Sequence, residues 1–162
     1  MSFNAEVKAS IGWNWTGGAT DNDRLDYAER LLEGNGNDQA EAVWHADAQS
    51  LSSGNSTLLD LTALTRTILD DTHSVAFLTV KALLLVSRST SVGTLLVGAA
   101  AGDQWSEPFG AEGDQVEVPP DSPMLLSNRQ TGWAVDASNK NLALSAVGGD
   151  VDYAIAIVGT TS

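Results

Sequence analysis

Short apolar segments separated by turn-forming residues make up most of this chain, from about Val43 to its end. Gly, Asn, Asp, Ser and Pro recur between segments such as 95–99, 142–147 and 151–158. Short strands separated by turn residues at regular spacing are typical of antiparallel β-sandwiches, and we expect about eight to ten strands here. The sequence therefore predicts a mainly β fold, a jelly-roll-like antiparallel sandwich over residues 42–162.

One longer apolar segment indicates the middle of a sheet. Residues 75–86 are nearly all apolar, apart from Thr79 and Lys81. A run of this kind is typical of a strand that is buried on both faces. We therefore expect residues 75–86 to form a central strand with both of its faces covered.

The first fifteen residues alternate strictly between apolar and polar side chains, which predicts an extended strand with one apolar face. At about 3.3 Å per residue, this strand would be about 45–50 Å long. It is either a bent strand that crosses between the two sheets of its own domain, or an arm that leaves the domain and pairs with a neighbouring chain. The candidate interface residues on its apolar face are Phe3, Val7, Ile11, Trp13 and Trp15.

A short α-helix is expected between Thr20 and Gly34. Thr20 or Asp21 can cap its first turn, and Gly34 can end it. Apolar residues follow at spacings of three and four, which predicts an apolar stripe on one side of the helix. The residues of this stripe are Leu25, Ala28, Leu31 and Leu32. Residues 1–41 are therefore predicted to form an N-terminal arm plus a helix, ahead of the sandwich.

The chain is strongly acidic, with 21 Asp and Glu residues against 8 Lys and Arg residues and a net charge of −13 at pH 7. Contacts to phosphate need Lys and Arg, so we expect no nucleic-acid partner. The acidic charge either keeps copies of the protein apart by self-repulsion or forms a face that docks on a basic partner.

Few residues are available for chemistry. The chain has no cysteine and only two histidines, His45 and His73, neither of which lies in a ligand-spaced cluster. Asp70, Asp71 and His73 have the residue types of a catalytic pair, but such pairs are built across space, so residues 70–73 are interpreted as a solvated loop. No nucleophile-elbow or phosphate-loop pattern occurs. The sequence therefore predicts a protein that is not an enzyme and that holds no metal or other cofactor.

The sequence gives no reason to expect a membrane partner. Residues 1–8 lack the basic and apolar regions of a signal peptide. Apolar stretches such as residues 82–86 are too short to span a bilayer. We expect a soluble protein that is made in a cytoplasm.

A polar loop at residues 102–110 contains two large aromatic residues, Trp105 and Phe109. If this loop is exposed, its rings offer a surface for a sugar or a protein partner. The alternative is a loop that packs its rings beneath the sandwich. Trp105 and Phe109 complete the set of candidate interface residues.

Seven segments spread over nearly the whole chain carry a resemblance to a known group of proteins. These segments are residues 10–15, 39–44, 80–85, 96–100, 108–110, 131–135 and 151–159. Their order resembles that in small virion proteins encoded in tailed-phage and prophage genomes. Many of those proteins have a Pro-Gly-Gly turn where this chain has Pro-Pro-Asp-Ser-Pro at residues 119–123. The resemblance brings no catalytic residues with it.

The resemblance implies a structural component of a virion. Our leading hypothesis is a capsid decoration or cement protein on the outer surface of the head. Its partners would be the major capsid protein and copies of itself, with a homotrimer expected by analogy. The alternative is a tail, fibre or baseplate component with a receptor- or carbohydrate-binding role. In both cases the protein would be made in the host cytoplasm.

Overall fold

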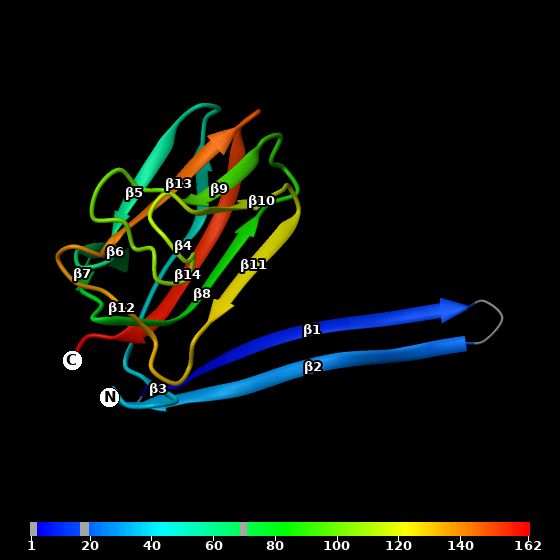
Figure 1. Ribbon diagram of the computed structural model, residues 1–162, viewed down its shortest axis with the longest axis horizontal. Helices are drawn as coiled ribbons and strands as arrows, with labels where there is room; N and C mark the ends of the chain where they lie inside the picture. Colours follow the sequence, from blue (N-terminus) through cyan, green and yellow to red (C-terminus); the bar gives the residue numbers. More distant parts are fainter. Residues whose placement is uncertain (1–2, 17–19, 69–70) are drawn as a thin grey trace.

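The computed structural model describes residues 3–16, 20–68 and 71–162, and it is built from β-strands (Figure 1). The strands in chain order are β1 (Ala5–Thr16), β2 (Thr20–Glu33), β3 (Gln39–Ala40), β4 (Ala42–Leu51), β5 (Ser56–Asp60), β6 (Leu64–Ile68), β7 (Asp71–Val75), β8 (Thr79–Ser87), β9 (Thr94–Gly98), β10 (Gln115–Val118), β11 (Ser122–Ser127), β12 (Trp133–Ala134), β13 (Asn141–Val147) and β14 (Val151–Thr160).

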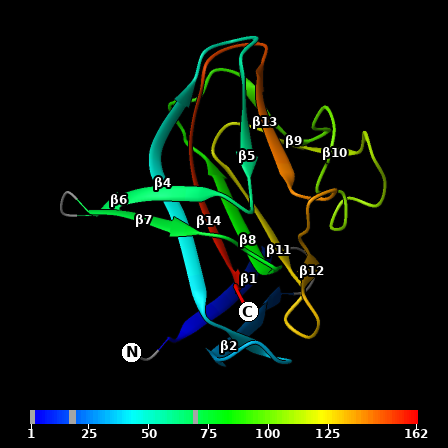
Figure 2. The ribbon, with the colours of Figure 1, turned by 90° about the vertical axis from the view of Figure 1, so that its left-hand side faces the viewer.

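Two antiparallel sheets form the body of the molecule. One has the order β11-β8-β14-β4, with β12 also paired to β8, and the other has the order β10-β9-β13-β5. The chain passes repeatedly from one sheet to the other, so strands that follow each other in sequence often lie in opposite sheets (Figure 2). This is the strand order of a jelly roll, and it confirms the predicted antiparallel sandwich.

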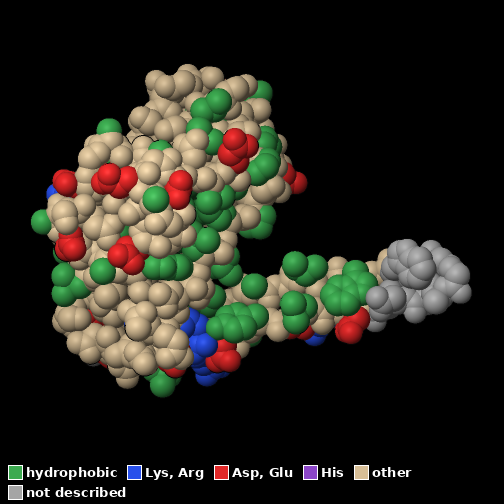
Figure 3. Space-filling model, viewed as in Figure 1, with side chains coloured by type: hydrophobic (Ala, Val, Ile, Leu, Met, Phe, Trp, Pro, Cys, Tyr) green, Lys and Arg blue, Asp and Glu red, His purple; other side chains and the backbone are tan. Residues whose placement is uncertain are grey.

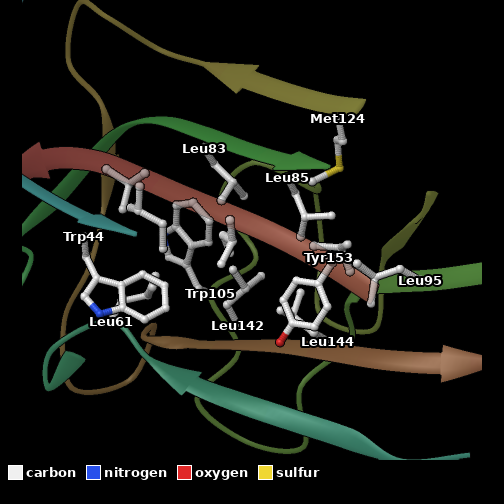
Figure 4. Packing of buried hydrophobic residues seen from close by; sticks show 14 of the residues in the cluster. Trp44, Leu61, Leu83, Leu85, Leu95, Trp105, Met124, Leu142, Leu144 and Tyr153 are labelled. Atoms are coloured by element: carbon white, nitrogen blue, oxygen red, sulfur yellow. The ribbon is translucent and has the colours of Figure 1, made fainter. Parts of the chain in front are cut away.

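The core fills the space between the two sheets. Leu83 and Leu85 of β8 lie in one buried cluster with Leu142 and Leu144 of β13 (Figure 4). These side chains alternate along their strands with residues that face outwards, as a pleated strand in a sandwich requires. The alternation that the sequence shows in β14 therefore matches its burial, which alternates from Val151 to Gly159.

The N-terminal strand belongs to a long arm that projects from the body (Figure 1). β1 pairs antiparallel with β2 along its whole length, from Ala5 opposite Leu31 to Thr16 opposite Thr20. The interpretation of residues 3–15 as a strand that crosses between the two sheets is therefore wrong. The extended strand itself is confirmed, and its partner within the chain is β2.

The predicted helix after Thr20 is also wrong, because the described residues 20–33 form the strand β2. Leu25, Tyr27 and Leu31 lie at even spacings and point to the face of the arm that carries the apolar residues of β1. Helix propensity is a weak local preference, and pairing with an already extended neighbour overrides it. The described part of residues 1–41 thus contains the antiparallel pair of β1 and β2 and the short strand β3, and no helix.

Two further predictions need correction. Residues 71–73, expected in a loop, belong to β7, which pairs with β6, while Asp70 lies outside the described residues. β8 is central in its sheet, between β11 and β14, but Leu84 is 41% exposed on its outer face. The base of the arm covers the outer face of β8 at Ala82, and among the described residues no further layer lies over the rest of that face.

Candidate functional site

One face of the arm is apolar and exposed. Ile11 lies opposite Leu25, and Ala9 lies opposite Tyr27. Directly opposite residues of antiparallel strands project from the same face. Ile11 is 70% exposed and Leu25 is 71% exposed, and Trp13 follows on the same face at 41%. We call the set Ala9, Ile11, Trp13, Leu25 and Tyr27 the arm face.

The opposite side of the arm is polar. Ser10 donates a hydrogen bond to Asp26 at 2.5 Å, and Arg24 pairs with the same carboxylate at 2.6 Å. Lys8 pairs with Glu6 at 2.7 Å. The hairpin is therefore amphipathic, although two carboxylates share the apolar side, Glu29 opposite Val7 and Asp23 opposite Trp13.

The arm face continues into a buried base where the hairpin meets the body. Val7 and Leu31 are buried there together with Ala82 of β8. Leu125 of β11 and Val158 of β14 pack against this cluster. The hairpin thus already uses its apolar side to contact the outer face of the β11-β8-β14-β4 sheet.

Polar contacts hold the base of the arm. The buried amino group of Lys81 donates to the carbonyl oxygens of Gln130 at 2.6 Å and Gly36 at 3.3 Å. Arg129 pairs with Asp38 at 2.9 Å and donates to the hydroxyl of Tyr27 at 2.9 Å. Burial lowers the pKa of Lys81, and the nearby Asp38 carboxylate partly opposes this shift. These contacts tie the start of the arm to the loop between β11 and β12.

Beyond the base, the outer face of the same sheet stays apolar and accessible. Its rows are set by the register, in which Leu84 lies beside Ala156 and Leu125, and Val86 lies beside Ala154. We call the set Leu84, Val86, Leu125, Ala154 and Ala156 the outer sheet face. A groove of about 150 Å³ runs where it meets the arm. That volume is small for a ligand pocket, which typically holds about 300–1,000 Å³.

The arm face and the outer sheet face border the same notch. Figure 3 shows hydrophobic side chains along the arm and on the flank of the body beside it, with a hollow between the two. The groove at the bottom of this hollow is lined from the arm by Glu6, Val7 and Lys8. The apolar surface therefore continues from the arm face to the outer sheet face, and the buried base lies between them.

The structure brings some of the predicted interface residues together and separates others. Ile11 and Trp13 lie exposed on the arm, whereas Val7 is buried and Phe3 half-buried at its base. Trp15 lies in β1 opposite Asp21, and its side chain lies outside the described residues. Neither Trp105 nor Phe109 belongs to the arm.

Trp105 needs a correction, because its side chain is 1% exposed and belongs to the core. Its ring makes edge-to-face contacts with Phe109 at 6.2 Å and Trp133 at 6.1 Å between centroids. The indole nitrogen donates to the carbonyl oxygen of Ala134 at 3.0 Å. The loop packs its aromatic rings beneath the sandwich, so Trp105 offers no surface for a sugar or a protein partner.

Of the residues considered for chemistry, His45 lies beside the outer sheet face, because it is opposite Ala156 in the pairing of β4 with β14. His45 lies in β4, 3.4 Å from Asp47, and His73 lies in β7 opposite Arg66. No group of three or more His, Cys, Asp or Glu side chains suited to a metal ion occurs in the part of the chain that the structure describes. That part also contains no helix long and apolar enough to cross a membrane.

Sequence reasoning missed Leu25, Tyr27 and Leu84 as surface residues. The even spacing of Leu25 and Tyr27 was a signal for a strand, but the spacing of three and four between other apolar residues of β2 competed with it. For Leu84, the apolar run of β8 predicted burial on both faces, and this was wrong because Leu84 is exposed. Whether a face is covered depends on the other layers of the fold.

Comparisons with known proteins do not assign the chain to a family. No family model matches it, and neither do curated proteins or solved structures.

Proposed function

We propose that this protein is a non-enzymatic structural component of a tailed-phage particle, a decoration or cement protein on the outside of the capsid. The observation that carries the proposal is the amphipathic arm, which projects from a jelly-roll body and exposes Ile11 and Leu25. Exposed apolar side chains on a projecting hairpin are typical of a protein that contacts other subunits. The resemblance of the sequence to small phage virion proteins supports the same role.

The charge of the protein favours the outer surface of the particle. A net charge of −13 leads to repulsion from packaged DNA, which is also negative. A decoration protein meets the shell from outside, where no such repulsion arises. The proposed partners are the major capsid protein and copies of this chain, with a trimer as the arrangement expected by analogy.

The test is to locate and count the protein in purified particles. Quantitative mass spectrometry should find hundreds of copies per particle, and a density map should place them on the outer capsid wall. A count of a few to a few tens would instead indicate a fibre or baseplate. A position on the inner wall, against DNA, would exclude a decoration role.

A matched pair of variants links the arm to this role. Ile11→Thr with Leu25→Thr should reduce the number of copies bound to particles that lack the protein. Ala28→Thr, on the exposed polar side of the arm, serves as the control and should bind as the unmodified protein does. Equal binding of both variants would show that the arm face takes no part in attachment.

A further inference from the structure

We propose that the arm face of one copy docks on the outer sheet face of a second copy of this chain. The contact would join Ile11 and Leu25 of the donor to Leu84, Ala154 and Ala156 of the acceptor. This inference goes beyond the proposed function, because it concerns the purified protein and needs no capsid.

The first argument is continuity with a contact that already exists within the chain. At the base of the arm, Val7 and Leu31 pack on Ala82, Leu125 and Val158 of the sheet. Ile11 and Leu25 extend the same side of the hairpin outwards. Leu84 and Ala156 extend the same side of the sheet. The base thus shows that the apolar side of the hairpin packs well on the outer side of the sheet. The arm face and the outer sheet face are the parts of these two surfaces that stay exposed.

The second argument comes from β8. Its sequence has the pattern of a strand buried on both faces, yet the sandwich covers only the face with Leu83 and Leu85. Leu84 on the other face is 41% exposed, beside the small side chain of Ala156. The small side chains of Ala154 and Ala156 leave a hollow beside Leu84 that can receive a larger side chain of a hairpin. An apolar outer face of this kind indicates a further layer supplied by another chain.

The third argument is geometric. The arm extends away from the body (Figure 1), and the strand from Lys8 to Thr16 adds about 30 Å beyond the buried base. The arm face and the outer sheet face of the same copy therefore point into a widening gap and do not contact each other beyond the base. A second copy can place its sheet face against the arm face of the first copy. The same contact, repeated between copies, covers both apolar surfaces. Because donor and acceptor surfaces differ, the contact is made either reciprocally in a dimer or head-to-tail in a ring.

The charges near the end of the arm favour a protein acceptor over a lipid surface. Asp23 and Asp26 lie on β2 in this part of the arm, and Arg24 lies between them in the sequence. Hairpins and helices that insert into membrane surfaces use Lys and Arg to meet anionic lipids. The outer sheet face is apolar at Leu84 and Ala154, and its β4 side carries Asp47, which lines the same hollow.

The chain has no cysteine, so introduced cysteines give an unambiguous test. One copy would carry Ile11→Cys, and a second copy, distinguished by a mass tag, would carry Leu84→Cys or Ala154→Cys. Each chain then holds one thiol, and a mixed disulfide can form only between copies whose side chains meet. We expect mixed dimers on mild oxidation of the two proteins together.

Two control pairs match this design. Ala28→Cys lies on the polar side of the arm, and Leu58→Cys is exposed on β5 of the other sheet. Ala28→Cys with Leu84→Cys, and Ile11→Cys with Leu58→Cys, should give no mixed dimer above background. Mixed dimers in the controls at the same yield would overturn the proposal, because they would reflect random collision.

Sedimentation equilibrium of the full chain provides a second measurement that does not depend on crosslinking. Ile11→Thr with Leu25→Thr, and separately Leu84→Thr, should each weaken self-association by about tenfold or more, because each removes buried apolar surface. Thr keeps a strong preference for strands, so the hairpin and the sheet should still form. Ala28→Thr and Leu58→Thr should leave the association constant unchanged.

Several results would overturn the proposal. The unmodified protein could stay monomeric at all accessible concentrations, or Ile11→Cys could crosslink only with itself, which would indicate arm-to-arm pairing. Binding of the monomer to vesicles of phosphatidylcholine and phosphatidylglycerol would identify a lipid surface instead. The outcomes are separate from the proposed function, since a monomer could still decorate a capsid, and an oligomer could form without one.

Discussion

Trp105 joins its own loop to a segment about thirty residues further along the chain, at Trp133 and Ala134. Its indole nitrogen bonds to the Ala134 carbonyl, and its ring contacts Phe109 and Trp133 edge to face. Trp13, the same residue type, lies half-exposed on the arm. The difference follows from the surroundings, because a loop that crosses the open end of a sandwich can bury a ring, whereas a projecting hairpin has no interior.

Replacing Trp105 should strongly destabilise the sandwich. Trp105→Ala removes a fully buried ring and one of the two side-chain donors to the Ala134 carbonyl, the other being Asn139, so we expect a loss of about 3–5 kcal/mol in the free energy of unfolding. Urea unfolding monitored by far-ultraviolet circular dichroism measures this loss. Val92→Ala, at a highly exposed position, is the control and should change stability by less than about 0.5 kcal/mol. A similar small effect for both would show that the loop does not contribute to the core.

Asp60 shows how a single carboxylate ties stability to pH. It accepts hydrogen bonds from the backbone and hydroxyl of Thr62 at 2.9 and 2.6 Å, and it pairs with Lys140 at 3.1 Å. The Thr62 hydroxyl bond is the largest cause that lowers the pKa of Asp60 below its usual 3.8. The folded protein therefore holds the proton less tightly than the unfolded chain does, and acid favours unfolding.

Asp60→Asn should consequently destabilise the protein in a pH-dependent way. At pH 7 the contribution of the ionised group is fully present, and we expect a loss of about 1 kcal/mol or less, because the site is partly exposed. As the pH falls below 3.8 and through the lowered pKa, the unmodified protein loses this contribution, and the difference should shrink. Urea unfolding of both proteins at pH 7 and in acid measures it. A difference that grows in acid would mean that the pKa of Asp60 is raised.

At the scale of single elements, neighbouring strands and layers determine the conformation of β2 and the burial of β8. β2 contains good helix formers, yet it is a strand because β1 offers it a ladder along its whole length. β8 has two apolar faces, and its inner residues Leu83 and Leu85 are fully buried while Leu84 between them is exposed. Pairing fixes the conformation of a strand, and the packing of layers fixes which face is covered.

Consecutive leucines of β8 should therefore respond very differently to truncation. Leu83→Ala and Leu85→Ala each create a cavity in the core and should cost about 2–5 kcal/mol of unfolding free energy. Leu84→Ala should change the stability of the monomer by less than about 0.5 kcal/mol. Urea unfolding at a protein concentration low enough to keep the chain monomeric compares the three. Equal losses at all three positions would mean that Leu84 is covered within one chain.

At the scale of the whole molecule, shape and charge act together. The body is a two-sheet jelly roll with one long projection, and the chain carries a net charge of −13. Copies of such a protein repel one another, so a contact between them needs apolar surface to offset the repulsion. The arm face and the outer sheet face supply surface of that kind.

Raising the salt concentration should therefore strengthen the proposed self-association. Going from about 0.1 M to 1 M shortens the Debye length from about 10 Å to about 3 Å, which screens the repulsion between acidic copies. The apolar contact itself is not weakened by this screening. Sedimentation equilibrium at several salt concentrations measures the trend. An association that weakens steeply with salt would show that ion pairs, and not the two apolar surfaces, hold the copies together.

Local pattern in the sequence was sufficient to predict the strand-rich sandwich and the extended N-terminal strand. Alternation with a period of two determines which side chains share a face, and it is visible in residues 3–15 and 151–158 without knowledge of any partner. The candidate residues Ile11 and Trp13 were found in this way. Their exposure on one side of a hairpin agrees with that pattern.

Tertiary contacts determined the features that the sequence pattern did not predict. Residues 20–33 became a strand through pairing with β1, and Trp105 became a core residue through contacts with Phe109, Trp133 and Ala134. The exposure of Leu84 depends on the absence of a layer over its sheet among the described residues. The physical reason is that periodicity specifies which side chains face the same way, whereas burial depends on what the rest of the chain places against that face.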